Sequence, residues 1–119
     1  MRVTRIVPDI IVPDLESAHG FYADYLGLDV EAFNLGWVTR RVSSDTGATV
    51  QLVTHDATAT EDPVLSVTVD DVEGALGEAE RRGYEIVHPL TTESWGVRRF
   101  FVRAPDGTVI NVVQDHAAG

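Results

Sequence analysis

The chain repeats its own pattern of strands and helices, and this repeat limits the folds that it can adopt. Residues 12–16 (VPDLE) match residues 69–73 (VDDVE) at an offset of 57. Residues 47–53 (GATVQLV) match residues 107–113 (GTVINVV) at an offset of 60. Each half reads as a strand, a helix and three further strands. Because all five elements keep their order, the sequence indicates a duplicated βαβββ module.

Apolar spacing and turn residues place the elements of the first half. Residues 3–12 alternate loosely and are rich in β-branched side chains, which predicts a strand. Apolar positions at helical spacing predict a helix over residues 15–26, with Asp14 as its N-cap and Gly27 at its C-terminal end. The aromatic side chains of this helix are expected to lie mostly in the core. Three further strands are predicted at 28–33, 37–42 and 49–54.

The second half follows the same plan. A strand is predicted at residues 64–69, and a helix at 72–82 capped by Asp70 or Asp71 and ended by Gly83. The remaining strands are predicted at 84–88, 98–103 and 109–114, with a frayed tail at 117–119. We therefore expect an α+β fold in one domain, 1–119, made of module 1 (1–56), a linker (57–63) and module 2 (64–116).

Composition excludes several functional classes. The 119 residues include 19 acidic and 9 basic side chains, which gives a net charge of −10. All nine basic side chains are arginine. Such a field repels phosphate backbones, so we expect no nucleic-acid partner. It serves solubility or attracts a cationic ligand. No apolar run is long enough to span a membrane and no signal peptide is evident, so a cytoplasmic protein without a membrane partner is expected. The absence of cysteine removes thiolate chemistry.

Several short motifs carry a family resemblance. They are VPDL at 12–15, FY at 21–22, LGL at 26–28, SWGVRRFF at 94–101 and PDG at 105–107. With the duplicated module, they make the chain resemble the vicinal-oxygen-chelate superfamily, which includes glyoxalase I, extradiol dioxygenases, fosfomycin-resistance enzymes and bleomycin-resistance proteins. The Trp-Gly segment is similar to one in the bleomycin-resistance branch. The resemblance implies two tandem βαβββ modules whose curled mixed sheets enclose a cavity, often completed in a homodimer.

The resemblance also identifies the positions at which metal-using relatives hold a divalent ion. Here these positions are Val7 and Val64 on the first strands, and Gln51 and Asn111 on the last strands. Valine has no donor atom, and a neutral amide oxygen is a weak ligand without an anionic partner. Shifting the alignment by one residue brings in no better ligand. We therefore expect neither a metal nor another cofactor.

Other residues are candidates for contact with a small ligand. Trp37 and Trp95 each lie beside a glycine and open the third strand of a module, so they either stack a planar or cationic ligand or seal the core. Ser66 and Thr68 alternate with apolar residues and should face away from the helix. The full set of ligand-binding candidates is Trp37, Gln51, His55, Ser66, Thr68, Trp95, Arg99 and Asn111. His55 belongs to the Gln51 face if its strand stays regular.

These observations predict a metal-free protein that binds a small organic molecule, with the antibiotic-sequestering resistance proteins as the model. The ligand is expected to be planar or cationic, and the protein a homodimer. The alternative is a lyase, isomerase or dioxygenase of the same superfamily. No catalytic residue is assigned, although Asp9, His55 or Arg99 could serve a metal-independent reaction. Asp9 is expected either to meet a ligand or to be a strand-edge charge in solvent.

Overall fold

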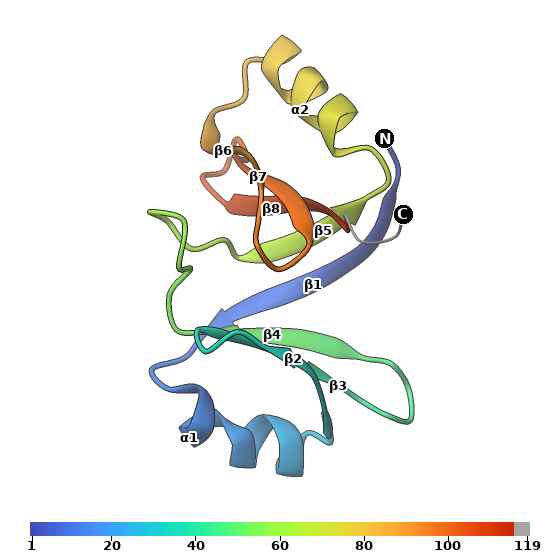
Figure 1. Cartoon of the computed structure of the whole chain (residues 1–119), viewed down its shortest axis with the longest axis vertical. Coiled ribbons are helices and arrows are strands. Elements are labelled where there is room, and N and C mark those ends of the chain that lie inside the picture. The colour runs from blue at the N-terminus through green and yellow to red at the C-terminus, as the bar shows by residue number, and fades with distance from the viewer. Residues whose placement is uncertain (116–119) are drawn as a thin grey trace. The chain divides into compact units, whose positions relative to one another are not determined.

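A computed structural model describes residues 1–115 as a mixed α+β chain (Figure 1). Its internal contacts group it into two units. The N-terminal unit is Val7–Ala59, and the C-terminal unit is Met1–Ile6 together with the chain from Thr60 onward. The predicted tail and His116 lie outside the described residues. Over residues 1–115, no helix is long and apolar enough to cross a membrane.

The N-terminal unit contains four strands in the hydrogen-bonded order β2-β3-β4-β1. Their bounds are β1 Val3–Ile11, β2 Val30–Asn34, β3 Val38–Val42 and β4 Thr49–Val53. β1 runs parallel to β4, with Asp9 opposite Gln51, and the other pairs are antiparallel. The parallel pair is possible because a helix connects the first strand to the hairpin strands, as parallel strands require a crossover connection.

The first helix departs from its prediction in its second half. It begins at Leu15, where the Asp14 side chain accepts a hydrogen bond from the Glu16 N–H. The α-helix α1 spans Leu15–His19, and a π-helical segment, η1, continues over Gly20–Tyr25. Phe21 is 54% exposed and Tyr25 is 76% exposed, so the prediction that these aromatic side chains lie in the core is wrong.

The C-terminal unit repeats the arrangement, with the order β5-β8-β7-β6. Its strands are β5 Leu65–Val69, β6 Ile86–Thr92, β7 Val97–Arg103 and β8 Val109–Asp115. Residues 1–6 join this unit, and just before β1 the Asp70 N–H donates to the Arg2 carbonyl and the Arg2 N–H donates to the Asp70 carboxylate. The helix α2, Val72–Arg81, is capped by Asp71, which accepts from the Gly74 N–H.

The core of the C-terminal unit lies between α2 and one face of its sheet. Val69, Val72, Ala75 and Phe100 are among its buried members. Val67, Val102 and Ile110 pack against them from the same sheet face. β6 extends beyond its predicted end at residue 88, because residues 91 and 92 pair with β7 after two register shifts.

Candidate functional site

The face of the C-terminal sheet opposite α2 carries the polar side chains that the repeat predicted. Ser66 and Thr68 alternate with Val67 and Val69, which pack toward α2, so both hydroxyls face away from the helix as expected. Asn111 lies beside Ser66 in the parallel β5–β8 pair and opposite Phe101 in the antiparallel β7–β8 pair. These side chains therefore share one face.

Asn111 is buried with half of its amide unused. It is 7% exposed, and its Nδ2 donates to the Ser66 Oγ at 3.0 Å. Among the described residues, its Oδ1 is a buried side-chain atom that accepts no hydrogen bond. The Phe101 ring follows in the same row, and the His88 ring lies 4.9 Å from it. A buried acceptor without a donor costs about 1–3 kcal/mol, and a bound donor group would recover this free energy.

Arg99 continues this face as part of a buried ion pair. Its Nε lies 2.6 Å from the Glu93 Oε2, and both side chains are about 5% exposed. Its guanidinium carbon is 5.0 Å from the Trp95 ring centroid and 4.8 Å from that of Phe101. Arg98 lies on the other face, where it pairs with Glu73 of α2 at 2.8 Å. The structure therefore decides which of the adjacent arginines, Arg98 or Arg99, belongs to the candidate site.

The corresponding face of the N-terminal unit carries a charged row. Asp9 Oδ1 accepts from Gln51 Nε2 at 2.6 Å, and Gln51 Oε1 accepts from Arg40 Nε and Nη2 at 3.0 and 2.7 Å. Arg40 also lies 4.7 Å from the Phe33 ring centroid. Asp9 is 7% exposed. The alternative that Asp9 is a strand-edge charge in solvent is therefore wrong.

The four positions that hold a metal in some relatives do not fit a divalent ion. Val7 and Val64 have no donor atom, and the Gln51 oxygen already accepts from the Arg40 guanidinium. That positive charge would repel a cation. Asn111 contributes one neutral oxygen, without an anionic partner at the three corresponding positions. Over residues 1–115 there is also no group of three or more His, Asp or Glu side chains that could hold a metal ion.

The predicted ligand-binding residues fall into three sets. Ser66, Thr68, Arg99 and Asn111 lie on one face of the C-terminal unit, with Trp95 against Arg99. Gln51 lies in the N-terminal row, and Trp37 is half-buried just before β3. His55 is exposed, and β4 ends at Val53, so the regular strand that would place it on the Gln51 face is absent.

Sequence reasoning missed two members of these rows. These are Arg40, which donates hydrogen bonds to Gln51, and Glu93, which forms the ion pair with Arg99. The register of Arg40 opposite Gln51 follows from the hairpin between β3 and β4, so counting back from the turn at residues 44–47 could have found it. Glu93 lies between the strands predicted at 84–88 and 98–103, and no periodicity marks it.

Comparison with known proteins agrees with this architecture. The model of the Glyoxalase/Bleomycin resistance protein/Dioxygenase superfamily matches residues 2–112. The chain therefore belongs to this superfamily, and its two βαβββ units are the fold of that class. No curated protein matches the chain.

Solved structures share the fold at low sequence identity. A member of the same superfamily from Vibrio splendidus 12B01 is 22% identical, with 93% of this chain and 98% of that chain covered and a TM-score of 0.74. An uncharacterized protein from Methanosarcina mazei is 24% identical, with 97% and 94% covered and a TM-score of 0.70. A protein titled NAD-dependent benzaldehyde dehydrogenase from Legionella pneumophila is 16% identical, with 93% and 99% covered and a TM-score of 0.74. These likenesses support the fold alone.

Proposed function

We propose that the protein binds a small planar organic molecule, without a metal ion, on the face of the C-terminal sheet opposite α2. The observation that carries this proposal is the buried Oδ1 of Asn111, which accepts no hydrogen bond within the described residues. An N–H or O–H group of a ligand would satisfy it. Ser66 fixes the amide from the other side through Nδ2, so the acceptor is already oriented.

The aromatic and cationic groups of this face favour a planar ligand over a cationic one. The Arg99 guanidinium already lies against the Trp95 and Phe101 rings. An incoming cation would have to compete with this guanidinium, which its ion pair with Glu93 holds in place, for the same two rings. A planar, neutral or weakly acidic molecule can instead stack on the aromatic surface that remains. Sequestration of a planar antibiotic is the specific form of binding that we propose.

Tryptophan fluorescence tests this proposal. The protein is titrated with a panel of quinone, polycyclic and glycopeptide antibiotics, and then Trp95→Ala is titrated with the members that bind. We expect saturable quenching. The affinity should fall roughly tenfold or more in Trp95→Ala, since ~1.4 kcal/mol corresponds to one decade in affinity. Trp37→Phe is the matched control, because Trp37 belongs to the other unit. No binding across the panel would contradict the proposal.

An enzymatic function is the second candidate, and one observation favours it. Asp9 is a buried carboxylate that the Gln51 amide holds in a fixed position, as a general base requires. Turnover of a thiol-adduct or catechol substrate that is lost in Asp9→Asn would support the enzyme. Turnover without loss in Asp9→Asn would exclude Asp9 as the base. We further propose that the protein is a homodimer, as the resemblance to its superfamily suggests, and that it is cytoplasmic.

A further inference from the structure

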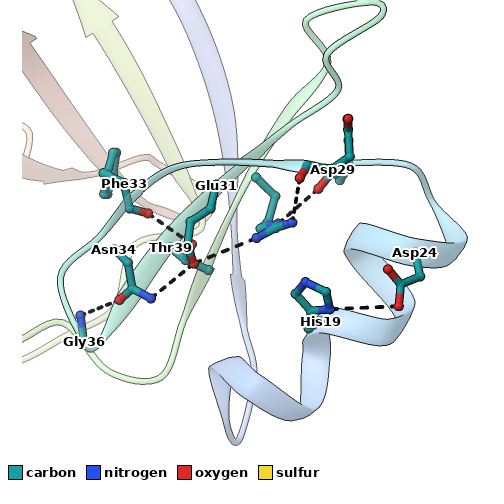
Figure 2. Close-up of polar contacts among 10 residues, drawn as sticks. His19, Asp24, Asp29, Glu31, Phe33, Asn34, Gly36 and Thr39 are labelled. Atoms are coloured by element: carbon teal, nitrogen blue, oxygen red, sulfur yellow. Dashed lines mark hydrogen bonds and ion pairs between the residues drawn. The ribbon is translucent and has the colours of Figure 1, made fainter.

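The N-terminal unit contains a pocket on the opposite side of its sheet from the Asp9–Gln51–Arg40 row. Its volume is about 570 Å³, and it lies between α1 and the strands β2, β3 and β4. Glu31, Thr39 and Arg41 line it from the strands, and Glu16 and His19 line it from α1. Figure 2 shows Glu31, Thr39 and Asn34 on the strands, with His19 on the neighbouring helical segment. A volume of this size accommodates a small organic ligand.

The repeat shows how unusual these lining residues are. Thr39 pairs with Leu52 as Phe100 pairs with Val112, and Glu31 pairs with Arg41 as Ile86 pairs with Val102. In the C-terminal unit, Phe100, Val102, Ile86 and Val112 form the apolar layer beneath α2. In the N-terminal unit, three of the four equivalent residues are polar or charged. One copy of the module therefore fills this layer with a hydrophobic core, and the other copy keeps a pocket there.

A β-bulge directs Glu31 into this pocket. Glu31 pairs with Arg41 and Phe33 pairs with Arg40, so the register shifts by one residue between them. Without the extra residue, Glu31 and Phe33 would point to the same face of the sheet. The bulge instead places Glu31 on the pocket side, whereas Phe33 lies with Arg40 on the other face. Bulges that redirect a side chain in this way are common beside functional sites.

Arg41 is the buried charge of the pocket, and its guanidinium is only partly used. The residue is 5% exposed, with Nε donating to the Leu28 carbonyl and Nη2 donating to the Asp29 carbonyl. Its Nη1 is 3.8 Å from Glu31 Oε1, which is too long for a hydrogen bond, and in residues 1–115 it donates to no other group. Because Arg41 lines the pocket, this donor of a largely buried charge can be reached from the pocket. Nη1 is therefore a donor available to an oxygen atom of a ligand.

The carboxylates that line the pocket favour a ligand with a cationic group. Glu31 Oε1 accepts from Thr39 Oγ1 and Asn34 Nδ2, while its Oε2 accepts no hydrogen bond in the described part of the chain. Asp14 and Glu16 line the same pocket. Three carboxylates against one arginine leave the lining negative, in agreement with the net charge of −10. An oxygen that binds Arg41 beside Glu31 must itself be uncharged, or it would be repelled.

From these observations we propose that the pocket between α1 and β2–β4 is a second ligand site. It would bind a small primary amine that carries a neutral hydrogen-bond-accepting oxygen, with the ammonium group on Glu31 and the oxygen on Arg41. This site is separate from the Asn111 face, because it lies in the other unit and on the helix side of its sheet.

NMR titration of the ¹⁵N-labelled full chain with glycinamide tests the second site. We expect saturable shifts at the backbone amides of Glu31, Thr39 and Arg41. Ethylamine lacks the oxygen and acetamide lacks the charge, so each should bind about tenfold more weakly than glycinamide. The same reduction is expected for glycinamide binding to Glu31→Gln, which keeps an acceptor for Thr39 but removes the charge.

Two further variants keep the test decisive if Glu31→Gln does not fold. Glu16→Gln changes an exposed residue of the pocket and should weaken glycinamide binding. Glu73→Gln changes an exposed carboxylate on α2 and should leave it unchanged. Failure of glycinamide to shift the pocket amides, equal binding of acetamide, or full affinity in both pocket variants would each overturn the second site. So would loss of glycinamide binding in Asn111→Leu, because the amine would then occupy the Asn111 face.

Discussion

Gln51 and Asn111 occupy equivalent positions of the two modules, yet their amides are in different states. Gln51 uses both ends of its amide, between Asp9 and Arg40. Asn111 uses only Nδ2, toward Ser66. The repeated sequence predicts that the two residues are equivalent, but not that one amide joins two charged groups while the other retains an unused acceptor. This difference decides which of the two faces we propose for the ligand.

Replacement of each amide by leucine should separate these two states. In Asn111→Leu an unsatisfied acceptor is removed, so we expect the free energy of unfolding to stay within about 1 kcal/mol of the parent protein. In Gln51→Leu, buried Asp9 loses its Gln51 hydrogen bond and Arg40 loses an acceptor, so a loss of about 2–3 kcal/mol is expected. Urea denaturation measures both values. Equal destabilisation by the two substitutions would show that Asn111 is as fully bonded as Gln51.

The alternation of side chains along each strand predicts which face of the sheet many of the candidate site residues occupy. Alternation alone places Ser66 and Thr68 on the face opposite the helix. It also separates Arg98 from Arg99, although it does not tell which of them faces α2. Pairs such as Arg99 with Glu93, or Arg40 with Phe33, depend on side-chain contacts across strands that alternation does not encode. His55 is misplaced because the strand ends two residues earlier, at Val53.

Among the elements, the first helix shows most clearly where local signals are insufficient. Asp14 and Gly27 set its limits as predicted, with Gly27 at φ +76°. Nothing in the apolar spacing indicates that the helix changes to π geometry at Gly20. In this segment His19 Nδ1 lies 4.0 Å from Asp24 Oδ2, five residues along the chain. Similarly, the bulge between Glu31 and Phe33 has no sequence signal, because neither glycine nor proline marks it.

Two glycines of this segment should respond oppositely to alanine. Gly20 has helical dihedral angles, and a Cβ atom there would meet no atom within 4 Å. We therefore expect Gly20→Ala to raise the free energy of unfolding by about 0.4–1 kcal/mol, because the unfolded chain loses freedom. Gly27→Ala should lower it by about 1 kcal/mol, because its positive φ strains an L side chain. Thermal denaturation measures both, and destabilisation by Gly20→Ala would contradict the helical geometry at this residue.

One carboxylate bonded to the turn before β4, that of Asp29, should make the stability of the protein depend on pH. The Ser44 backbone N–H, and then the Ser44 hydroxyl, hold the pKa of Asp29 below its ordinary range. The ionised Asp29 carboxylate therefore stabilises the folded protein, and this contribution is complete above the pKa that Asp29 has in the unfolded chain. It is lost as the pH falls through the lowered pKa of the folded state.

Carboxyl ¹³C NMR titration of the parent protein and of Ser44→Ala measures this effect. The substitution removes the hydroxyl but keeps the backbone donor, so the pKa of Asp29 should rise part of the way to its ordinary value. Asp106 is the internal control, because the Thr108 backbone N–H lowers its pKa independently of Ser44. An unchanged Asp29 titration in Ser44→Ala would show that the hydroxyl has no role in this turn.

At the scale of the whole molecule, the repeat predicts the order of the elements, and the short motifs together with the repeat indicate the family; both are confirmed. The division of the chain into units is less simple, because residues 1–6 group with the later part of the chain rather than with module 1. Hydrogen bonds between Arg2 and Asp70, and from the Thr4 hydroxyl to the Thr68 carbonyl, join these residues to the later part of the chain. Local periodicity cannot encode such contacts, since the two residues are far apart in the sequence.

The oligomeric state is a prediction at this scale. Superfamily resemblance leads us to expect a homodimer, with a mass of twice the 13.0 kDa chain. Light scattering coupled to size-exclusion chromatography at micromolar concentration measures the mass directly. Repeating the measurement at high salt shows whether the −10 charge of each chain opposes association, in which case the dimer should strengthen. A 13.0 kDa species at every concentration would exclude the dimer.

The most direct test of the central claim is the affinity of Asn111→Leu for the tightest planar ligand of the fluorescence panel. Both tryptophans remain in this variant, so quenching can be compared directly with the parent protein. We predict that the affinity falls about tenfold or more, because the ligand donor loses its buried acceptor while the fold keeps its stability. An unchanged affinity in a folded Asn111→Leu protein would contradict the assignment of the ligand to this face.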